Sequence, residues 1–237
     1  REICLILEQM GIYPESSHHE EGPGQNEIDF RYSDPLTAAD NTLTFQAVVK
    51  TVAERNGLYA DFSPKPLRHQ PGNGFHINIS VKGGNCEDPL SHMIAGILAH
   101  ISELTVFLNP TVASYERFGG PKAPEYISWS NQNRSQLIRV PAAVDAYRRA
   151  ELRSPDPTTN PYLAFALLIY AGLDGIQQKL PLPAPTDLNL FTASADILAG
   201  LQRLPLTLRE AATLAANSSF VSQYLPKTIV QTYYNQR

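Results

Sequence analysis

The sequence has very little cysteine, and this excludes one common kind of site. Cys4 and Cys86 are the only thiols, and they are far apart and form no CxxC pattern. A structural zinc centre built on cysteine needs more thiols than these. Two isolated cysteines are typical of free or buried thiols in a reducing compartment, so we expect a cytoplasmic protein.

An excess of positive charge and a long apolar run are also missing. The formal net charge is -4, which argues against a nucleic-acid partner held by a general basic field. The longest apolar run, residues 162–173, is too short to cross a bilayer, so we expect no membrane association. The chain starts at Arg1, without Met and within a helical pattern, so we expect upstream residues to be missing.

Three common catalytic motifs are absent as well. The sequence has no GxxxxGK[ST] phosphate loop, no complete GxGxxG dinucleotide motif and no GxSxG nucleophile elbow. A site for phosphate or for an activated carboxylate must therefore be built from other residues.

What the sequence does contain predicts an α+β protein with a helical C-terminal region. Apolar spacing and capping residues predict helices over 1–10, 34–57, 89–108 and from 160 to about 175. Strands are predicted over 12–18, 25–32, 58–63, 74–81, 125–130, 136–140 and 147–152. A proline-rich connector at 180–190 precedes two or three closing helices, one of them opened by a capping box at 207–210. We therefore divide the chain into an α+β core, 1–180, and a helical extension of the same domain, 181–237.

The densest polar group lies on a predicted hairpin. Glu15, His18, Glu20 and Glu27 flank a turn at residues 21–24. Alternate residues of a strand share a face, so His18 and Glu20 point the same way, and the returning strand could bring Glu27 beside Glu20. Facing carboxylates repel each other, and a divalent cation such as magnesium or manganese relieves that repulsion. The alternative is a charged, solvated hairpin without a ligand.

A second group follows a pair of glycines. Gly72 and Gly74 allow a ligand to approach the backbone closely. His76 then shares a strand face with Asn78 and Ser80, where it could contact a metal ion or a phosphate. The alternative is a histidine that only makes a hydrogen bond within its strand.

A third group combines arginines with one acid. The arginines are Arg117, Arg134, Arg139, Arg149 and Arg153. Glu151 lies between the last two and is expected to share their strand face. Guanidinium groups match phosphate and carboxylate oxygens, so a metal-binding acid flanked by arginines is typical of phosphoryl transfer. The alternative is an exposed row of ion pairs that contributes little stability.

Taken together, these segments resemble the glutamine synthetase family. The segments that carry the resemblance, in the family's order, are 17–20, 24–29, 38–40, 64–66, 109–111, 133–135, 138–141, 151–156, 160–164 and 171–176. The resemblance implies a curved, mostly antiparallel sheet, a partial barrel or funnel, packed with helices. It also implies a C-terminal catalytic domain that lacks the family's N-terminal β-grasp domain. Because the family's site forms between subunits of a homo-oligomeric ring, we expect the chain alone to be inactive.

The resemblance further implies a reaction and the residues that serve it. Family members join glutamate and ammonia with ATP through γ-glutamyl phosphate, and use two or more Mg²⁺ or Mn²⁺ ions. By position, the metal ligands would be Glu20, Glu27, His76 and Glu151. Residues bordering the nucleotide would be Glu15, Tyr32, Asn78, Ser80, Arg134, Arg139 and Arg149, with Tyr32 against the adenine. Gly72, Arg117 and Arg153 would hold glutamate, and Arg117, Arg139 and Arg153 would be the catalytic arginines.

The chain departs from the family pattern around its substrate residues. Pro71 stands where an asparagine usually precedes Gly72, and Ala113 replaces another asparagine. Lys122 stands where the family has a glutamate that helps to take a proton from the ammonium-derived group, and the loop 117–124 is one residue shorter than usual. A cation at this place should repel ammonium.

Three functions follow from these observations. The first is a glutamate–ammonia ligase, the second is a γ-glutamyl ligase for a polyamine or another amine, and the third is a degenerate homologue that only binds ligands. Lys122 favours the second function. The retained acids, His76 and Arg153 argue against the third, since drift alone should have damaged them.

Overall fold

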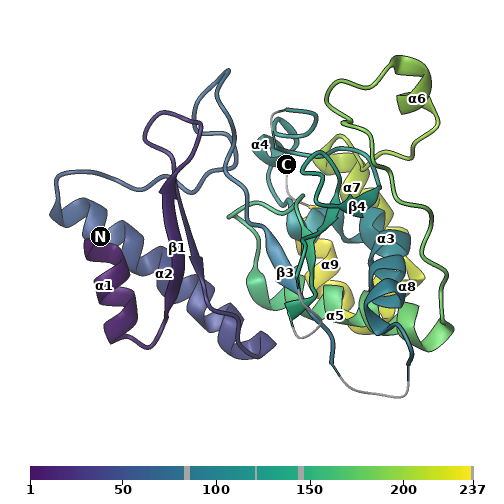
Figure 1. Ribbon diagram of the computed structural model, residues 1–237, viewed down its shortest axis with the longest axis horizontal. Coiled ribbons are helices and arrows are strands. Elements are labelled where there is room, and N and C mark those ends of the chain that lie inside the picture. Colours follow the sequence, from purple (N-terminus) through teal and green to yellow (C-terminus); the bar gives the residue numbers. More distant parts are fainter. Residues whose placement is uncertain (83–85, 121, 144–146, 236–237) are drawn as a thin grey trace.

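The computed structural model describes residues 1–82, 86–120, 122–143 and 147–235, so Pro121 of the shortened loop lies outside the described residues. Figure 1 shows two lobes side by side. The N-terminal lobe contains α1 (Glu2–Gln9), β1 (Pro14–His19), β2 (Asn26–Phe30) and α2 (Pro35–Arg55). The other elements form the larger C-terminal lobe.

In the N-terminal lobe, a two-stranded hairpin packs with two helices. β1 and β2 are antiparallel, and His18 lies opposite Glu27. Asp34 accepts a hydrogen bond from the Thr37 N–H and Pro35 fixes the first turn, so α2 begins where the sequence predicts. The buried cluster of this lobe is small and consists of Leu7, Ile12, Val48 and Val52. Few buried side chains therefore support the hairpin, and most of β1 is exposed.

The C-terminal lobe combines a small sheet with most of the helices. In chain order its elements are β3 (Ile77–Ile79), α3 (Pro89–Leu108), α4 (Val112–Tyr115), β4 (Trp129–Asn131), β5 (Ile138–Val140), β6 (Ala150–Leu152), α5 (Pro161–Gln178), α6 (Ala195–Ala199), α7 (Leu208–Asn217), α8 (Ser219–Tyr224) and α9 (Lys227–Tyr234). The sheet order is β3-β6-β5-β4, and all its pairs are antiparallel except β4–β5. The predicted α+β class and mostly antiparallel pairing are confirmed, although the described strands form two small open sheets.

The centre of this lobe is the crossing of α3 and α5. A Cβ atom built on Gly96 would lie 2.1 Å from the Ala171 carbonyl oxygen, and one on Gly175 would lie 2.1 Å from the His92 carbonyl oxygen. The two backbones therefore touch at a point where only glycine fits. By length and composition α3 could cross a membrane, but 61% of its apolar window is buried in the protein, as in a core helix.

One predicted strand, 58–63, is wrong, because other groups take its backbone hydrogen bonds. The Asn73 amide donates to the carbonyl oxygens of Asp61 and Ser63, at 3.1 and 2.9 Å. The Asp61 carboxylate accepts from the Ser63 N–H at 2.8 Å. A segment whose backbone is bonded to side chains in this way leaves no regular ladder for a neighbouring strand.

The described part of the closing region, up to residue 235, contains four helices, α6 to α9, rather than the two or three predicted. Ser218 ends α7 and also caps α8 through the Val221 N–H, so one apolar stretch is divided in two. The predicted capping box is present in altered form. Thr207 accepts from the Glu210 N–H, but the Glu210 carboxylate accepts from Leu206, one residue earlier than expected.

Candidate active site

The hairpin of the N-terminal lobe gathers a set of metal-ligand atoms. The His18 Nε2 lies 3.2 Å from the Glu20 Oε1 and 3.6 Å from the Glu27 Oε1. One ligand atom from each of these residues lies within 4.8 Å of the other two. Burial, and then the charges of Asp29 and Glu20, raise the pKa of the Glu27 carboxyl. A carboxyl group held beside other acids in this way gains from a bound cation.

A cation from the chain itself already reaches this cluster. The Lys122 Nζ lies 2.6 Å from the Glu20 Oε2 and 3.2 Å from the Glu21 Oε1. Burial opposes ionisation of Glu20, but the hydrogen bond and charge of Lys122 outweigh burial and lower the pKa of that carboxyl. The sequence did not predict this contact, which joins residues 102 positions apart.

In the C-terminal lobe, the buried acid Glu151 contacts two arginines and a histidine. Glu151 lies opposite Asn78 of β3 and Arg139 of β5 in the sheet. Its Oε1 lies 2.6 Å from the Arg153 Nη1 and 3.3 Å from the His76 Nδ1, and Arg139 donates to Oε2. The fold therefore brings His76 to Glu151 and Arg153, two predicted residues that are neighbours of each other but lie far from His76 in the sequence.

Electrostatics fix the charge of this second cluster. Burial alone would raise the pKa of Glu151, but the His76 hydrogen bond and the nearby guanidinium groups lower it to about 2. Burial, aided by the charges of Arg153 and Arg117, lowers the pKa of His76 despite its contact with Glu151. A carboxylate beside a neutral imidazole offers lone pairs to a metal ion or an acceptor to a proton.

Arg117 is a buried cation with an incomplete set of partners. The residue is only 3% exposed, and its Nη1 donates to the Ser154 carbonyl oxygen at 3.0 Å. Among the described residues its Nε has no hydrogen-bond partner. Burial lowers the pKa of Arg117 to about 10, so the group stays charged at neutral pH. A buried guanidinium with an unpaired donor is suited to an anionic ligand.

Gly72 lies directly against this arginine, which explains why the position is glycine. A Cβ atom on Gly72 would lie 2.6 Å from the Arg117 Cγ and 2.6 Å from the Pro64 carbonyl oxygen. A Cβ atom on Gly74 would lie 3.0 Å from the His76 Nε2 and 3.4 Å from the Arg117 Nη2. The glycine pair therefore lets the side chains of His76 and Arg117 approach the same stretch of backbone, whereas the predicted approach of a ligand stays a prediction.

Gln25 connects the hairpin to this glycine segment, and sequence reasoning assigned it no role. Its Nε2 donates to the Gly72 carbonyl oxygen at 3.1 Å and to the Asn73 Oδ1 at 2.9 Å. Its Oε1 accepts from the Gly22 N–H at 3.2 Å. The link was not predictable from spacing alone, because the partners are 47 and 48 positions apart.

Comparison with known proteins assigns the chain to a family. Residues 1–237 match the family described as glutamine synthetase, catalytic domain. The chain belongs to this family. It is 46% identical to the glutamine synthetase of Methanosarcina mazei, over 98% of the chain and 56% of that protein. It is 42% identical to that of Methanocaldococcus jannaschii, over 98% of the chain and 55% of that protein. The chain thus spans about half the length of the curated relatives it matches.

Solved structures give the same result. A structure titled as a GmaS/ADP complex is 30% identical and superposes with a TM-score of 0.86, over 98% of this chain and 57% of that chain. A structure titled as apo GmaS is 32% identical, with a TM-score of 0.87 over the same shares. The family resemblance predicted from the sequence is therefore confirmed.

The residues predicted to border the nucleotide lie in different surroundings. Asn78 and Arg149 lie together, since the Arg149 Nε donates to the Asn78 Oδ1 at 3.1 Å, on the sheet that carries Glu151. Ser80 lines a small cavity of about 210 Å³ after β3. The other predicted side chains are exposed or only partly buried: Glu15, Tyr32, Arg134 and Arg139. The Arg134 carbonyl oxygen accepts from the Arg153 Nε at 3.1 Å, so its backbone supports the Glu151 cluster.

The family is generally dependent on ATP and a divalent metal ion, and the hairpin residues fit such an ion. Two carboxylates and an imidazole form a donor set that suits Mg²⁺ or Mn²⁺, with water or phosphate completing the coordination. At Glu151 the fit is less direct. Both carboxylate oxygens already accept from arginines, so a metal ion there would have to replace or share one of these contacts.

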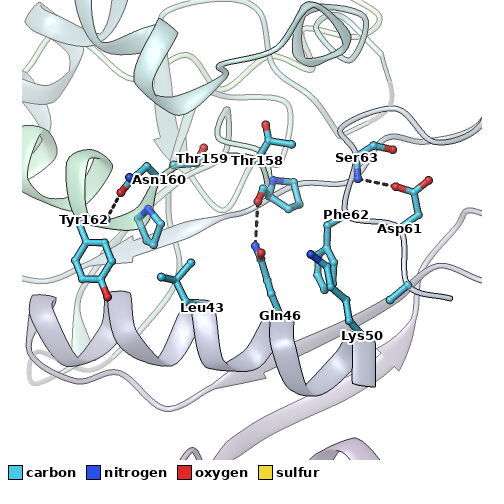
Figure 2. A pocket seen from close by; sticks show the side chains of 13 residues that line it. Leu43, Gln46, Lys50, Asp61, Phe62, Ser63, Thr158, Thr159, Asn160 and Tyr162 are labelled. Carbon is cyan, nitrogen blue, oxygen red and sulfur yellow. Dashed lines mark hydrogen bonds between the residues drawn. The ribbon is translucent and has the colours of Figure 1, made fainter. Parts of the chain in front are cut away.

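The larger of the two described cavities lies away from these charged clusters. This groove has a volume of about 590 Å³. Figure 2 shows that its lining residues include residues from α2 and from the start of α5. Gln46 crosses it and donates to the Pro157 carbonyl oxygen at 2.9 Å, and Asn160 caps α5. Lys50 and Asp61 are the charged residues in its lining. Because its main polar groups are bonded to each other, we place the chemistry at the charged clusters.

Proposed function

We propose that the protein carrying this chain is an ATP-dependent glutamate–ammonia ligase. An oxygen of the glutamate γ-carboxylate attacks the γ-phosphorus of ATP, the bond to the β–γ bridging oxygen breaks, and ADP leaves. The nitrogen of ammonia then attacks the acyl carbon, phosphate leaves, and a proton is lost to give the amide. Neither step needs a covalent enzyme nucleophile, so positioning and charge neutralisation carry the catalysis.

The observation that carries this proposal is the buried, incompletely paired Arg117. Its guanidinium lies beside Gly72 and Gly74, where a small carboxylate ligand could contact both the cation and the backbone. Arg153 and Arg139 form ion pairs with the Glu151 carboxylate. Their guanidinium groups would supply positive charge where negative charge develops during phosphoryl transfer. The GmaS/ADP title of a similar structure supports a nucleotide as the second ligand.

The remaining roles are assigned by position. Glu20 and Glu27, with His18 from the same cluster, would hold one divalent ion, and His76 with Glu151 would hold another. When bound, these ions neutralise phosphate oxygens. Residues proposed to border the nucleotide are Glu15, Tyr32, Asn78, Ser80, Arg134, Arg139 and Arg149, and those proposed to hold glutamate are Gly72, Arg117 and Arg153.

A second candidate keeps the same chemistry but changes the amine. The Lys122 ammonium lies on Glu20 and Glu21, so a positive charge already stands at the hairpin acids. Ammonium would be repelled by this charge, whereas an amine whose reacting nitrogen is neutral would not be. This contact favours a γ-glutamyl ligase for another amine over one that uses ammonium.

ATP turnover measured as phosphate release tests these functions. The protein carrying this chain is given glutamate with ammonia, and then glutamate with a panel of amines. Turnover with ammonia supports the first candidate, turnover only with a larger amine replaces it by the second, and no turnover with any amine contradicts both.

A matched pair of variants tests the role of Arg117. Arg117→Lys keeps the charge but loses the guanidinium fork, so the KM for glutamate should rise about tenfold to a hundredfold. Arg209→Lys makes the same exchange on the exposed surface of α7 and should leave the KM unchanged. An unchanged KM in Arg117→Lys would remove Arg117 from the glutamate site.

We also propose that residues 1–180 and 181–237 belong to one catalytic domain. Leu204, Leu208 and Val221 share a buried cluster with residues of α3 and α5, which supports this division into a core and its extension. A homo-oligomeric ring and a cytoplasmic location remain predictions from the family and the sequence.

A further inference from the structure

Lys122 is held in place by a hydrogen-bonded turn that starts at the buried Arg117. The Gly120 N–H donates to the Arg117 carbonyl oxygen at 3.0 Å, and the Ala123 N–H donates to the Gly120 carbonyl oxygen at 3.1 Å. The Gly119 N–H donates to the Ala123 carbonyl oxygen at 3.0 Å. Lys122 itself has a φ of 60°, in a left-handed region that a non-glycine residue adopts only at some energetic cost. The turn therefore fixes the direction in which this lysine leaves the backbone.

The carboxylate that Lys122 reaches is shared with the metal-ligand cluster. The Glu20 Oε1 contacts the His18 Nε2 at 3.2 Å, while the Oε2 contacts the Lys122 Nζ at 2.6 Å. The two side chains are 17% and 31% exposed, so water screens this contact only partly. A divalent ion at the cluster would therefore sit within a few ångströms of a fixed positive charge.

We propose that Lys122 is an internal cation that competes with the divalent metal ion for Glu20, and so sets the metal affinity of the His18–Glu20–Glu27 cluster. The proposal rests on the proposed function only in taking this cluster as a metal site. An ion that binds there must either displace the ammonium from Glu20 or tolerate its repulsion. Removing the charge of Lys122 should therefore tighten metal binding on the order of tenfold at low ionic strength.

A titration with Mn²⁺ alone tests this proposal, with free Mn²⁺ followed by electron paramagnetic resonance. Lys122→Gln removes the charge and should bind Mn²⁺ about tenfold more tightly than the unmodified chain. Lys122→Arg keeps the charge and should bind with nearly the original affinity. Lys227→Gln, on the exposed start of α9, changes the net charge equally and should leave the affinity unchanged. Circular dichroism on each variant checks that it is folded.

A double variant locates the effect at Glu20. In a Glu20→Gln background, Lys122→Gln should tighten Mn²⁺ binding by a clearly smaller factor, because the competition for the shared carboxylate is gone and only the repulsion remains. Equal affinities of the unmodified chain and Lys122→Gln, an equal gain in Lys227→Gln, or no saturable binding in any variant would overturn the proposal.

The titration contains neither nucleotide nor glutamate, so its outcome is separate from that of the turnover assay. Tighter Mn²⁺ binding in Lys122→Gln without any ligase activity would uphold this inference and contradict the proposed function. Ligase activity together with equal Mn²⁺ affinities would do the reverse.

Discussion

The two lobes each present carboxylates to the proposed site, but in opposite electrostatic settings. On the hairpin, Glu20 and Glu27 share a partly exposed surface with other acids, and Lys122 is the cation that reaches Glu20 among the described residues. In the sheet, the single acid Glu151 is buried and contacts two arginines and a histidine. The hairpin cluster is therefore short of positive charge, whereas the sheet cluster already has it.

This difference teaches how the surroundings of a glutamate decide its chemistry. Burial and nearby acids raise the pKa of Glu27, whereas the His76 hydrogen bond and the arginines lower that of Glu151 to about 2 against the effect of burial. The first setting favours capture of an added cation. The second favours a carboxylate that holds its arginines in fixed positions, ready to receive an anion such as phosphate.

The largest expected effect is a difference in unfolding free energy between variants of the two clusters. Arg153→Met removes a buried partner of Glu151 and should lower the free energy of unfolding by about 3–5 kcal/mol, because a buried charge loses compensation. Lys122→Met removes the partner of Glu20 on the more exposed hairpin and should lower it by less than about 1 kcal/mol. Urea denaturation of both variants measures the two values. Equal losses would mean that burial does not distinguish the clusters.

Acid titration should show the same contrast, because the fold lowers the pKa of Glu151 and raises that of Glu27. Since the folded state lowers the pKa of Glu151 from 4.5 to about 2, this group stabilises the fold fully above about pH 4.5. That contribution, on the order of 3 kcal/mol, is lost as the pH falls toward 2. Glu151→Gln should therefore flatten the loss of unfolding free energy over this range.

Glu27→Gln is the matched control for this titration. The pKa of Glu27 is raised in the fold, so the ionised group opposes folding and its protonation favours it. The variant should remove a small gain of stability on acidification near and above pH 4.5. The same pH dependence in both variants would contradict the opposite pKa directions.

A smaller loss is expected from the packing beneath the sheet cluster. Gly96→Ala forces a methyl group against the Ala171 carbonyl oxygen, so α3 and α5 must separate, at a cost of about 1–3 kcal/mol or more. Gly200→Ala adds the same methyl at an ordinary contact, 3.5 Å from the Ile197 carbonyl oxygen, and should change stability little. Thermal unfolding compares the two variants. An unchanged melting temperature in Gly96→Ala would show that the helices can separate freely.

The smallest expected effect is the salt dependence of the hairpin pair. At 1 M salt the screening length is about 3 Å, comparable to the length of the Lys122–Glu20 contact, so the contribution of this contact should fall markedly. The buried Arg153–Glu151 contact should keep most of its effect. Repeating the denaturation of the Lys122→Met and Arg153→Met variants in high salt measures the difference, and parallel losses would contradict it.

Local signals allowed much of the fold to be predicted from the sequence. Asp34 and Asn160 each precede a proline and cap a long helix, as predicted from the sequence, and Asp88 caps the predicted helix that begins at Pro89 in the same way. The strands were harder, because their short ladders depend on distant partners. Residues 58–63 have an extended pattern, but the Asn73 amide bonds their carbonyl groups instead.

Some contacts of the proposed site could likewise be predicted from the sequence, and others could not. The gathering of His18, Glu20 and Glu27 follows from strand alternation and a tight turn, both visible in the sequence. The contacts of Lys122 and Gln25 do not, because each spans a long stretch of chain and depends on how the two lobes meet. Family resemblance marked Lys122 as unusual, but only the structure identifies its partner.

The side-chain amide of Gln25 would couple a ligand bound at the hairpin to a ligand bound at the glycine segment. It ties the hairpin turn to Gly72 and Asn73, so these segments share one set of hydrogen bonds. Ligands that each reorganise this set would be thermodynamically linked, and linkage is reciprocal. Glutamate would then change the Kd of Mn²⁺ by the same factor by which Mn²⁺ changes the Kd of glutamate. Gln25→Ala should bring that factor toward one, which paired titrations would measure.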